Sequence, residues 1–234
     1  MKKIINYLKK RYGLAKKCES MKKVDYSLYL VTNRNEKTDE EFLAIIEEAI
    51  LGGVSIVQLR EKDASTGEFY RLALKLKELT SKYNIPLIIN DRLDVALAID
   101  ADGVHVGQTD MPADIIRNII GKNKILGVSA ATIRDAKKAK KDGADYIGSG
   151  AIFPTQTKDA DCISMDYLKE IIKSIDIPVI AIGGLAENNI SSLANTNIGG
   201  ISVVSAIMES KNPKKASENL KREFESLWFN KFKS

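Results

Sequence analysis

The chain has 234 residues, a net charge of +5 and 44% hydrophobic residues. This length suits one large α/β domain with its own core, which excludes the small folds that depend on disulfides or structural metals. The two cysteines, Cys18 and Cys162, lack a paired spacing and favour a cytoplasmic protein with reduced thiols, and no apolar run reaches the roughly 18 residues of a membrane span.

The positive charge is concentrated at the start of the chain. Residues 1–24 hold nine Lys or Arg and one acid, Glu19, so the net charge of this segment is +8. Since the whole chain has a net charge of +5, the remaining residues have a net charge of −3. A mildly acidic body argues against a nucleic-acid partner. We interpret residues 1–24 as a basic N-terminal extension, either a solvated segment or one with its own partner, and Met21 as an alternative start. It is not a secretory signal, because it lacks an apolar core and a cleavage site.

From residue 25 onward, short apolar runs alternate with helical patterns. The first predicted strand is Ser27–Thr32, and Thr38 with Glu41 forms a capping-box pattern before a helix that Gly52 and Gly53 end. Further strands are predicted at Val54–Leu59, Pro86–Asn90, Gly103–Val106, Ile125–Val128, Tyr146–Ser149, Pro178–Ile182 and Gly200–Val204. Helices are predicted near 66–83, 92–99, 112–120, 132–142, 166–174 and 187–194, and from Pro213 to about Trp228.

This alternation predicts a single (β/α)8 (TIM) barrel over residues 25–234. The strands are apolar almost throughout, as in parallel sheets that are buried on both faces. An internal echo supports the count, because DADGVHVG at 100–107 resembles DGADYIGSG at 142–150. No G-x-G-x-x-G follows the first strand, which argues against a dinucleotide-binding sheet.

Polar residues collect where the predicted strands end, and this is the end of a barrel that carries the active site. The second strand ends in Gln58, Arg60 and Lys62, which alternate onto one side. The other strand ends carry Asn90, Asp91, His105, Asp110, Ser129, Thr155, Gln156, Thr157, Lys158, Gly183, Gly184, Val204 and Ser205.

These residue types indicate two anion sites. Asp91 and Asp110 are hard oxygen ligands suited to Mg²⁺, which takes one or two carboxylates together with substrate phosphates. Arg60 and Lys62 place positive charge beside them, as a departing diphosphate requires. Backbone N–H groups of the seventh and eighth loops, at 183–184 and 204–205, suit a phosphate monoester.

Structural roles are the alternatives. Asp91 and Asp110 could cap the helices that follow them, and Arg60 could pair with Glu61, for which we favour a structural role over a catalytic one. For His105, the only histidine, we favour a hydrogen bond to a loop over a general base.

The remaining alternatives concern loops and aromatic residues. Gly183 and Gly184 could form only a turn, and residues 155–158 could be an ordinary surface loop. Tyr26 and Tyr29 indicate packing, with no functional role.

Taken together, the motifs resemble the thiamine phosphate synthase family over about residues 26–215. The matching segments are YLVT (29–32), QLREK (58–62), Asn90-Asp91, GVHVGQTD (103–110), GVS (127–129), TQTK (155–158) and IGG (182–184). The resemblance implies a transferase of thiamine biosynthesis. It would join a pyrimidine diphosphate to a thiazole phosphate carboxylate and release diphosphate and CO₂, with phosphorylated small molecules as its partners.

The resemblance also implies roles for individual residues. The pyrimidine diphosphate site would comprise Gln58, Leu59, Arg60, Glu61, Lys62, Asn90, Ser129 and Lys158. Among these, the leaving group would be stabilised by Arg60, Lys62, Ser129 and Lys158. Mg²⁺ would be bound by Asp91 and Asp110. The thiazole phosphate site would comprise Thr155, Gln156, Thr157, Gly184, Val204 and Ser205.

Two other functions remain as hypotheses. A thiazole tautomerase, an isomerase of the same superfamily, uses a histidine after the sixth strand, where this chain has Ala151. A barrel that only binds a phosphorylated metabolite would not need Asp91, Asp110, Arg60 and Lys62 together.

Overall fold

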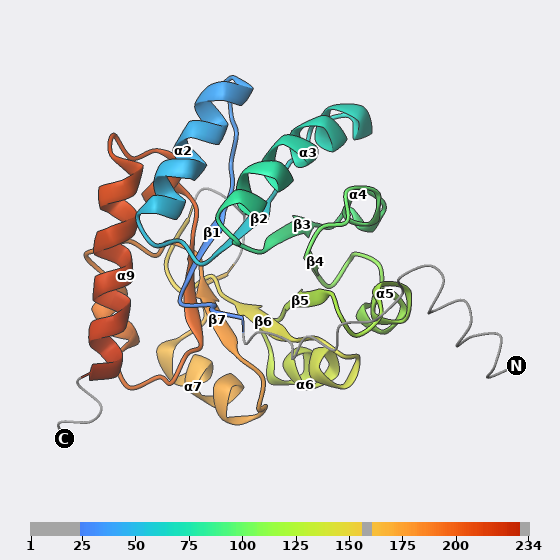
Figure 1. Ribbon diagram of the computed structural model, residues 1–234. Coiled ribbons are helices and arrows are strands. Elements are labelled where there is room, and N and C mark those ends of the chain that lie inside the picture. Colours follow the sequence, from blue (N-terminus) through green and yellow to red (C-terminus); the bar gives the residue numbers. More distant parts are fainter. Residues whose placement is uncertain (1–23, 156–160, 230–234) are drawn as a thin grey trace, which may run out of the picture.

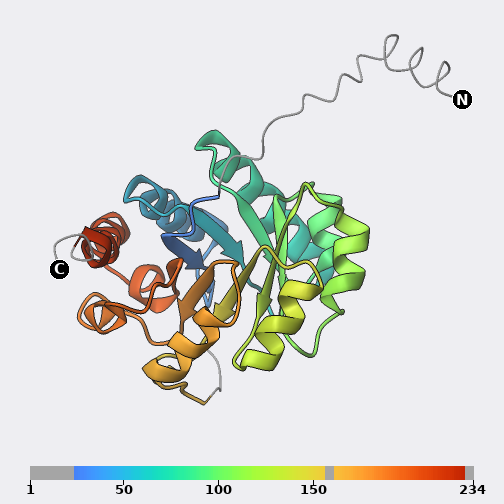
Figure 2. The ribbon, with the colours of Figure 1, turned by 90° about the horizontal axis from the view of Figure 1, so that it is seen from below.

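The computed structural model describes residues 24–155 and 161–229. In these residues, parallel strands close into a barrel, in sequence order, with β8 paired to β1, and helices surround it (Figure 1). A view turned by 90° shows the strands enclosed by the helices (Figure 2). The strands are β1 (Leu28–Val31), β2 (Ile56–Leu59), β3 (Leu87–Asn90), β4 (Gly103–Val106), β5 (Ile125–Ser129), β6 (Tyr146–Ser149), β7 (Val179–Ile182) and β8 (Gly200–Val203). The predicted TIM barrel is confirmed.

The helices follow the strands in turn. They are α2 (Asp39–Leu51), α3 (Thr66–Lys82), α4 (Leu93–Ala98), α5 (Ala113–Ile120), α6 (Ile133–Lys141), α7 (Met165–Lys173), the 3₁₀ helix η1 (Ile190–Leu193), α8 (Ser205–Met208) and α9 (Pro213–Phe229). None of the described helices is both long and apolar enough to cross a membrane.

The ends of α2 follow the sequence pattern. The Thr38 N–H donates to Glu41 Oε2 at 2.9 Å, and the Glu41 N–H donates to Thr38 Oγ1 at 3.2 Å, which is the predicted capping box. A good cap of this kind contributes about 1 kcal/mol. Gly52 ends the helix, and a Cβ there would lie 2.3 Å from Lys214 O, so glycine also allows α9 to pack closely on α2.

Two elements differ from the prediction. The stretch predicted as a helix near 187–194 forms only the short η1, because Asn189 accepts from the Ala186 N–H and Ser192 Oγ donates to Asn189 O, so local bonds replace helical ones. The short helix α8, directly after β8, was not predicted.

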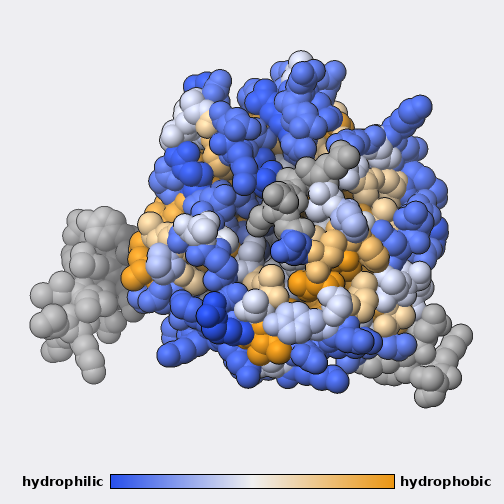
Figure 3. Space-filling view, turned by 180° about the vertical axis from the view of Figure 1, so that it is seen from behind, coloured by the Kyte–Doolittle hydropathy of each residue, from blue (hydrophilic) through white to orange (hydrophobic). Residues whose placement is uncertain are grey.

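Alternation along the strands divides the core into two clusters. On β1, Tyr29 and Val31 point into the barrel, whereas Leu28 and Leu30 pack between the barrel and its helices. The interior also carries polar side chains, among them the buried Gln58 and His105. The outer surface on the face opposite to Figure 1 is mostly hydrophilic, with separate hydrophobic patches (Figure 3). The interior of the barrel is therefore where polar groups become functionally informative.

Candidate active site

Asp91 and Asp110 lie together after neighbouring strands. The two carboxyl groups interact closely enough that burial, the charge of Asp110 and a hydrogen bond with it raise the pKa of Asp91 to about 6. Within the described part of the chain no third carboxylate, cysteine or histidine joins them to form a larger ligand cluster. Two adjacent carboxylates that repel each other are suited to share a divalent cation.

Backbone geometry holds each aspartate in place. Asp91 has a φ of 60°, in the left-handed region, and its N–H donates to His105 O at 2.8 Å. Asp110 Oδ2 accepts from the Gly107 N–H at 2.7 Å, inside its own loop. The residues that precede α4 and α5, Arg92 and Pro112, make no side-chain cap, and neither aspartate caps these helices. The capping alternative is therefore wrong.

Arg60 and Lys62 belong to the same cluster. Their charges act on Asp91 and oppose the rise of its pKa, so Arg60 and Lys62, like Asp110, lie within electrostatic reach of Asp91. The loop is anchored where the Arg60 N–H donates to the buried Thr32 Oγ1 at 3.2 Å. Among the described residues Arg60 forms no ion pair with Glu61 or any other acid, so that alternative is also wrong.

Glu61 is half-buried and lies within electrostatic reach of Arg34 and Arg60. Burial raises the pKa of its carboxyl, and the charges of Arg34 and Arg60 partly offset that rise. Its Oε1 is buried and has no hydrogen-bond partner among the described residues. The expected structural partner for that oxygen is therefore not found in the part of the chain that the structure describes.

His105 is part of a chain of side chains inside the barrel. Its Nδ1 lies 2.9 Å from Tyr146 Oη, and its Nε2 lies 2.9 Å from Ser129 Oγ. Tyr146 Oη is 2.7 Å from Tyr29 Oη, which accepts a hydrogen bond from Gln58 Nε2, also at 2.7 Å. The His105 side chain thus bonds to side chains of β6 and β5 inside the barrel, while its backbone oxygen accepts from Asp91 in the loop after β3. Both of its nitrogens are engaged.

Tyr29 and Tyr146 were missed as site residues by the sequence reasoning. The signal that could have found Tyr29 is its place two residues before Val31, on the inward face of β1. For Tyr146, the inward register follows only once β6 is paired with Gly127 of β5.

The second predicted anion site lies partly within the described residues. Gly183 and Gly184 have φ values of 101° and 64°, and a Cβ on Gly184 would lie 2.6 Å from Pro154 O, so the β7 loop packs directly on the β6 loop beside Thr155. Val204 and Ser205 open α8, where the first N–H groups have no partner within the helix. Gln156, Thr157 and Lys158 lie outside the described residues.

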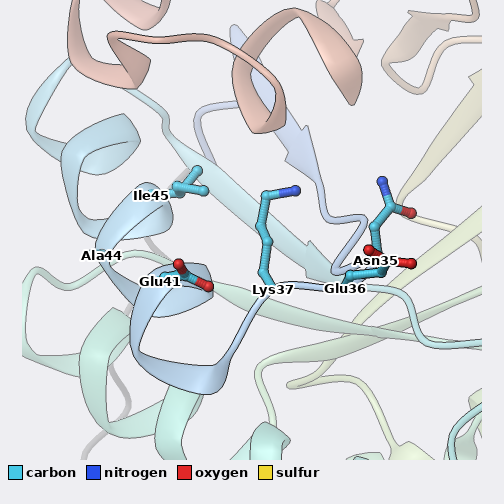
Figure 4. A pocket seen from close by; sticks show the side chains of 6 residues that line it. All are labelled: Asn35, Glu36, Lys37, Glu41, Ala44 and Ile45. Carbon is cyan, nitrogen blue, oxygen red and sulfur yellow. The ribbon is translucent and has the colours of Figure 1, made fainter.

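An open depression beside α2 is a different feature. It has a volume of about 900 Å³ and is lined by the β1–α2 loop and the start of α2, where Lys37, Glu41 and Ile45 face it (Figure 4). It is broad and open, and neither Asp91, Asp110, Arg60 nor Lys62 contributes to it. This depression is therefore separate from the cluster formed by Asp91, Asp110, Arg60 and Lys62.

Comparison with known proteins gives one consistent result. A family model described as thiamine monophosphate synthase matches residues 28–207. A thiamine-phosphate synthase of Methanobrevibacter smithii is 64% identical over 207 residues, which cover 88% of this chain and 99% of the relative. One of Alkaliphilus oremlandii is 59% identical, covering 85% of this chain and 95% of the relative.

A solved structure agrees with these relatives. Thiamine phosphate pyrophosphorylase from Pyrococcus furiosus superposes with a TM-score of 0.80 at 39% identity, covering 87% of this chain and 98% of that structure. The match to the family model, residues 28–207, includes the barrel strands, Asp91, Asp110 and the QLREK segment. This chain belongs to the thiamine monophosphate synthase family.

Proposed function

We propose that this chain is a transferase of thiamine biosynthesis that joins 4-amino-5-hydroxymethyl-2-methylpyrimidine diphosphate to a thiazole phosphate carboxylate. The C–O bond to the diphosphate breaks first and leaves a pyrimidine-methyl cation, which the amino-substituted ring stabilises. The thiazole nitrogen then forms the new C–N bond, and the products are thiamine phosphate, diphosphate and CO₂. Family membership and 64% identity to a thiamine-phosphate synthase support this reaction.

One observation carries the proposal: the charges of Asp110, Arg60 and Lys62, from the loops after β4 and β2 at one end of the barrel, all act on the carboxyl group of Asp91. Departure of a diphosphate concentrates negative charge on its oxygens, and cations fixed in advance stabilise that charge most. Arg60 binds phosphate oxygens through its planar guanidinium, while Lys62 acts as a point charge. We assign the same leaving-group role to Ser129 and Lys158, and Gln58, Leu59, Glu61 and Asn90 to the pyrimidine side.

The donor set fits Mg²⁺, since it consists of two carboxylates and leaves the other coordination positions to water and substrate phosphates. Asp91 and Asp110 would hold the ion, which when bound would neutralise diphosphate charge. A tautomerase of this superfamily would use a histidine after the sixth strand. This chain has the buried Ala151 there, and the ring nitrogens of its one histidine bond to Tyr146 and Ser129, which favours the synthase.

The thiazole phosphate is assigned to the other side of the same barrel end. We propose that it is bound by Thr155, Gln156, Thr157, Gly184, Val204 and Ser205, where backbone N–H groups and hydroxyls surround a compact anion. The exposed free thiol of Cys162 supports a cytoplasmic location.

The test is a reaction with matched variants. Purified chain, both phosphorylated substrates and Mg²⁺ should yield thiamine phosphate, and Asp91→Asn should lower kcat by at least about 100-fold through loss of a charged ligand. Asp114→Asn, which removes an exposed carboxylate from α5, is the control and should retain the native rate. An inactive native chain, or equal rates for the two variants, would refute the assignment.

A further inference from the structure

Five side chains from five strands form a continuous hydrogen-bonded chain through the barrel. They run from Gln58 on β2 through Tyr29 on β1, Tyr146 on β6 and His105 on β4 to Ser129 on β5, with links of 2.7 to 2.9 Å. These strands surround the axis of the barrel in Figure 1. The first four side chains are at most 8% exposed, so water does not compete for their bonds. Only its two ends, Gln58 and Ser129, belong to the proposed substrate site.

The direction of this chain follows from counting protons. Gln58 donates through Nε2 to Tyr29 Oη. Either hydroxyl can be the donor in the 2.7 Å bond between Tyr29 and Tyr146, and we infer that Tyr29 donates, because Tyr146 Oη is the acceptor within reach of its proton. Burial raises the pKa of both tyrosines, and each hydroxyl therefore keeps one proton to give. Tyr146, having accepted from Tyr29, donates to His105 Nδ1. A neutral His105 that accepts at Nδ1 carries its proton on Nε2 and donates it to Ser129 Oγ.

The direction of the hydrogen bonds decides whether the Ser129 hydroxyl can act as a donor. Ser129 receives a hydrogen bond from His105, so its own hydroxyl proton is free of the histidine and can be donated elsewhere. In the reverse direction, Ser129 would donate to His105 Nε2 and turn only lone pairs outward. Diphosphate oxygens accept hydrogen bonds and do not donate them, so only the first direction makes Ser129 useful to the leaving group.

We propose that Tyr29, Tyr146 and His105 are positioning residues, whose one-way hydrogen-bond chain from Gln58 fixes His105 as the Nε2–H tautomer and so presents the Ser129 hydroxyl as a donor to the diphosphate. This inference rests on the proposed function for the role of Ser129. The tautomer itself does not, because it is inferred from the hydrogen bonds inside the barrel and is measured without any assay of activity.

His105 is the only histidine of the chain, so imidazole ¹⁵N chemical shifts of a protein without added histidines report this one ring. The native protein should show a protonated Nε2 and an unprotonated Nδ1. Tyr146→Phe removes the donor to Nδ1, and the spectrum should change to the other tautomer or to a mixture. A protonated Nδ1 in the native protein, or an unchanged spectrum in Tyr146→Phe, would overturn the direction of the chain.

Kinetics of the same variants test the positioning role. Tyr146→Phe should lower kcat/KM for the pyrimidine diphosphate by about 10- to 100-fold, the range for a lost hydrogen bond to a charged group, and leave KM for the thiazole phosphate within about twofold. Tyr29→Phe, which interrupts the chain one link earlier, should act in the same direction. Equal losses for both substrates would indicate general damage to the barrel and refute positioning.

Tyr26→Phe is the matched control. Its ring packs on Tyr146 with centroids 4.9 Å apart in the same interior cluster, but its hydroxyl is not a member of the chain. It should keep the native ¹⁵N spectrum and native kinetics. If the native protein made no thiamine phosphate but showed the expected tautomer, the proposed function would fail and the hydrogen-bond direction would stand.

Discussion

Asp91 illustrates how a substrate site costs stability at the scale of one residue. Its pKa rises from 3.8 to about 6 because burial and the Asp110 charge oppose ionisation. Between these two pH values the unfolded chain loses the proton and the folded chain keeps it, so the folded state is increasingly disfavoured as pH rises. This loss of folding stability reaches its full size above about pH 6 and is absent below pH 3.8.

Asp91→Asn should therefore stabilise the metal-free protein at neutral pH. Asn tolerates the φ of 60° at this position, and the substitution removes the repulsion. Because Asp91 is half-buried, solvent screening reduces the gain to about 1 kcal/mol, or about 2–4 °C in Tm. Thermal melts with a chelator, recorded from pH 4 to pH 8, should show the difference from the native protein appearing between pH 4 and 6. A difference that shrinks as pH rises would contradict this account.

At this scale, sequence reasoning located the charged cluster but not its interior support. Arg60, Lys62, Asp91 and Asp110 could be found because each follows a strand directly, and strand ends of a parallel barrel meet at one edge. The hydrogen-bonded side chains inside the barrel could not be found in this way, since Tyr29 and Tyr146 are 117 residues apart and meet only when the barrel closes.

At the scale of elements, the β7 loop depends on a left-handed backbone conformation at a position with no room for a side chain. Gly184 combines a φ of 64° with contacts that would place a Cβ 2.6 Å from Pro154 O. Gly184→Ala should destabilise the protein by about 1–3 kcal/mol and raise KM for the thiazole phosphate more than KM for the pyrimidine diphosphate. Denaturant unfolding and two-substrate kinetics measure both effects.

Gly67→Ala provides the comparison for this prediction. Gly67 lies in the first turn of α3, where a Cβ would meet only Arg71 Nη1 at 3.5 Å. Helical Ala is favoured over Gly by roughly 0.5–1 kcal/mol, so this variant should be slightly more stable and fully active. If Gly184→Ala and Gly67→Ala had the same stability and the same KM for the thiazole phosphate, the backbone conformation of Gly184 would not matter for binding.

Elements were predictable where hydrophobic pattern and packing agree. Each predicted strand contains the observed one or differs from it by one residue, as with Ser129 at the end of β5, because short apolar runs between turn residues have one stable use in a buried parallel sheet. The helix predicted at residues 187–194 was wrong in extent, because Ser and Asn side chains there bond to the nearby backbone and restrict the helix to η1.

For the whole molecule, closure of the barrel defines where the essential chain begins. β1 is held between β2 and β8, and its approach is fixed from residue 25 onward. Lys221 of α9 pairs with Asp25 at 3.1 Å and bonds to Ser27, while Tyr26 packs inside the barrel against Tyr146. The family model likewise starts at residue 28. Among the described residues, Val24, the last residue of the proposed extension, also packs against the interior cluster.

Deleting residues 1–20 should leave kcat and Tm within about twofold and about 2 °C of the full chain, because every contact just described is kept. Deleting residues 1–26 should lower Tm by several degrees, since Tyr26 leaves a cavity beside Tyr146 and Asp25 no longer pairs with Lys221. Activity assays and melts of the two truncated proteins separate these cases. A large loss of kcat on removal of residues 1–20 would show that the basic extension belongs to the catalytic unit.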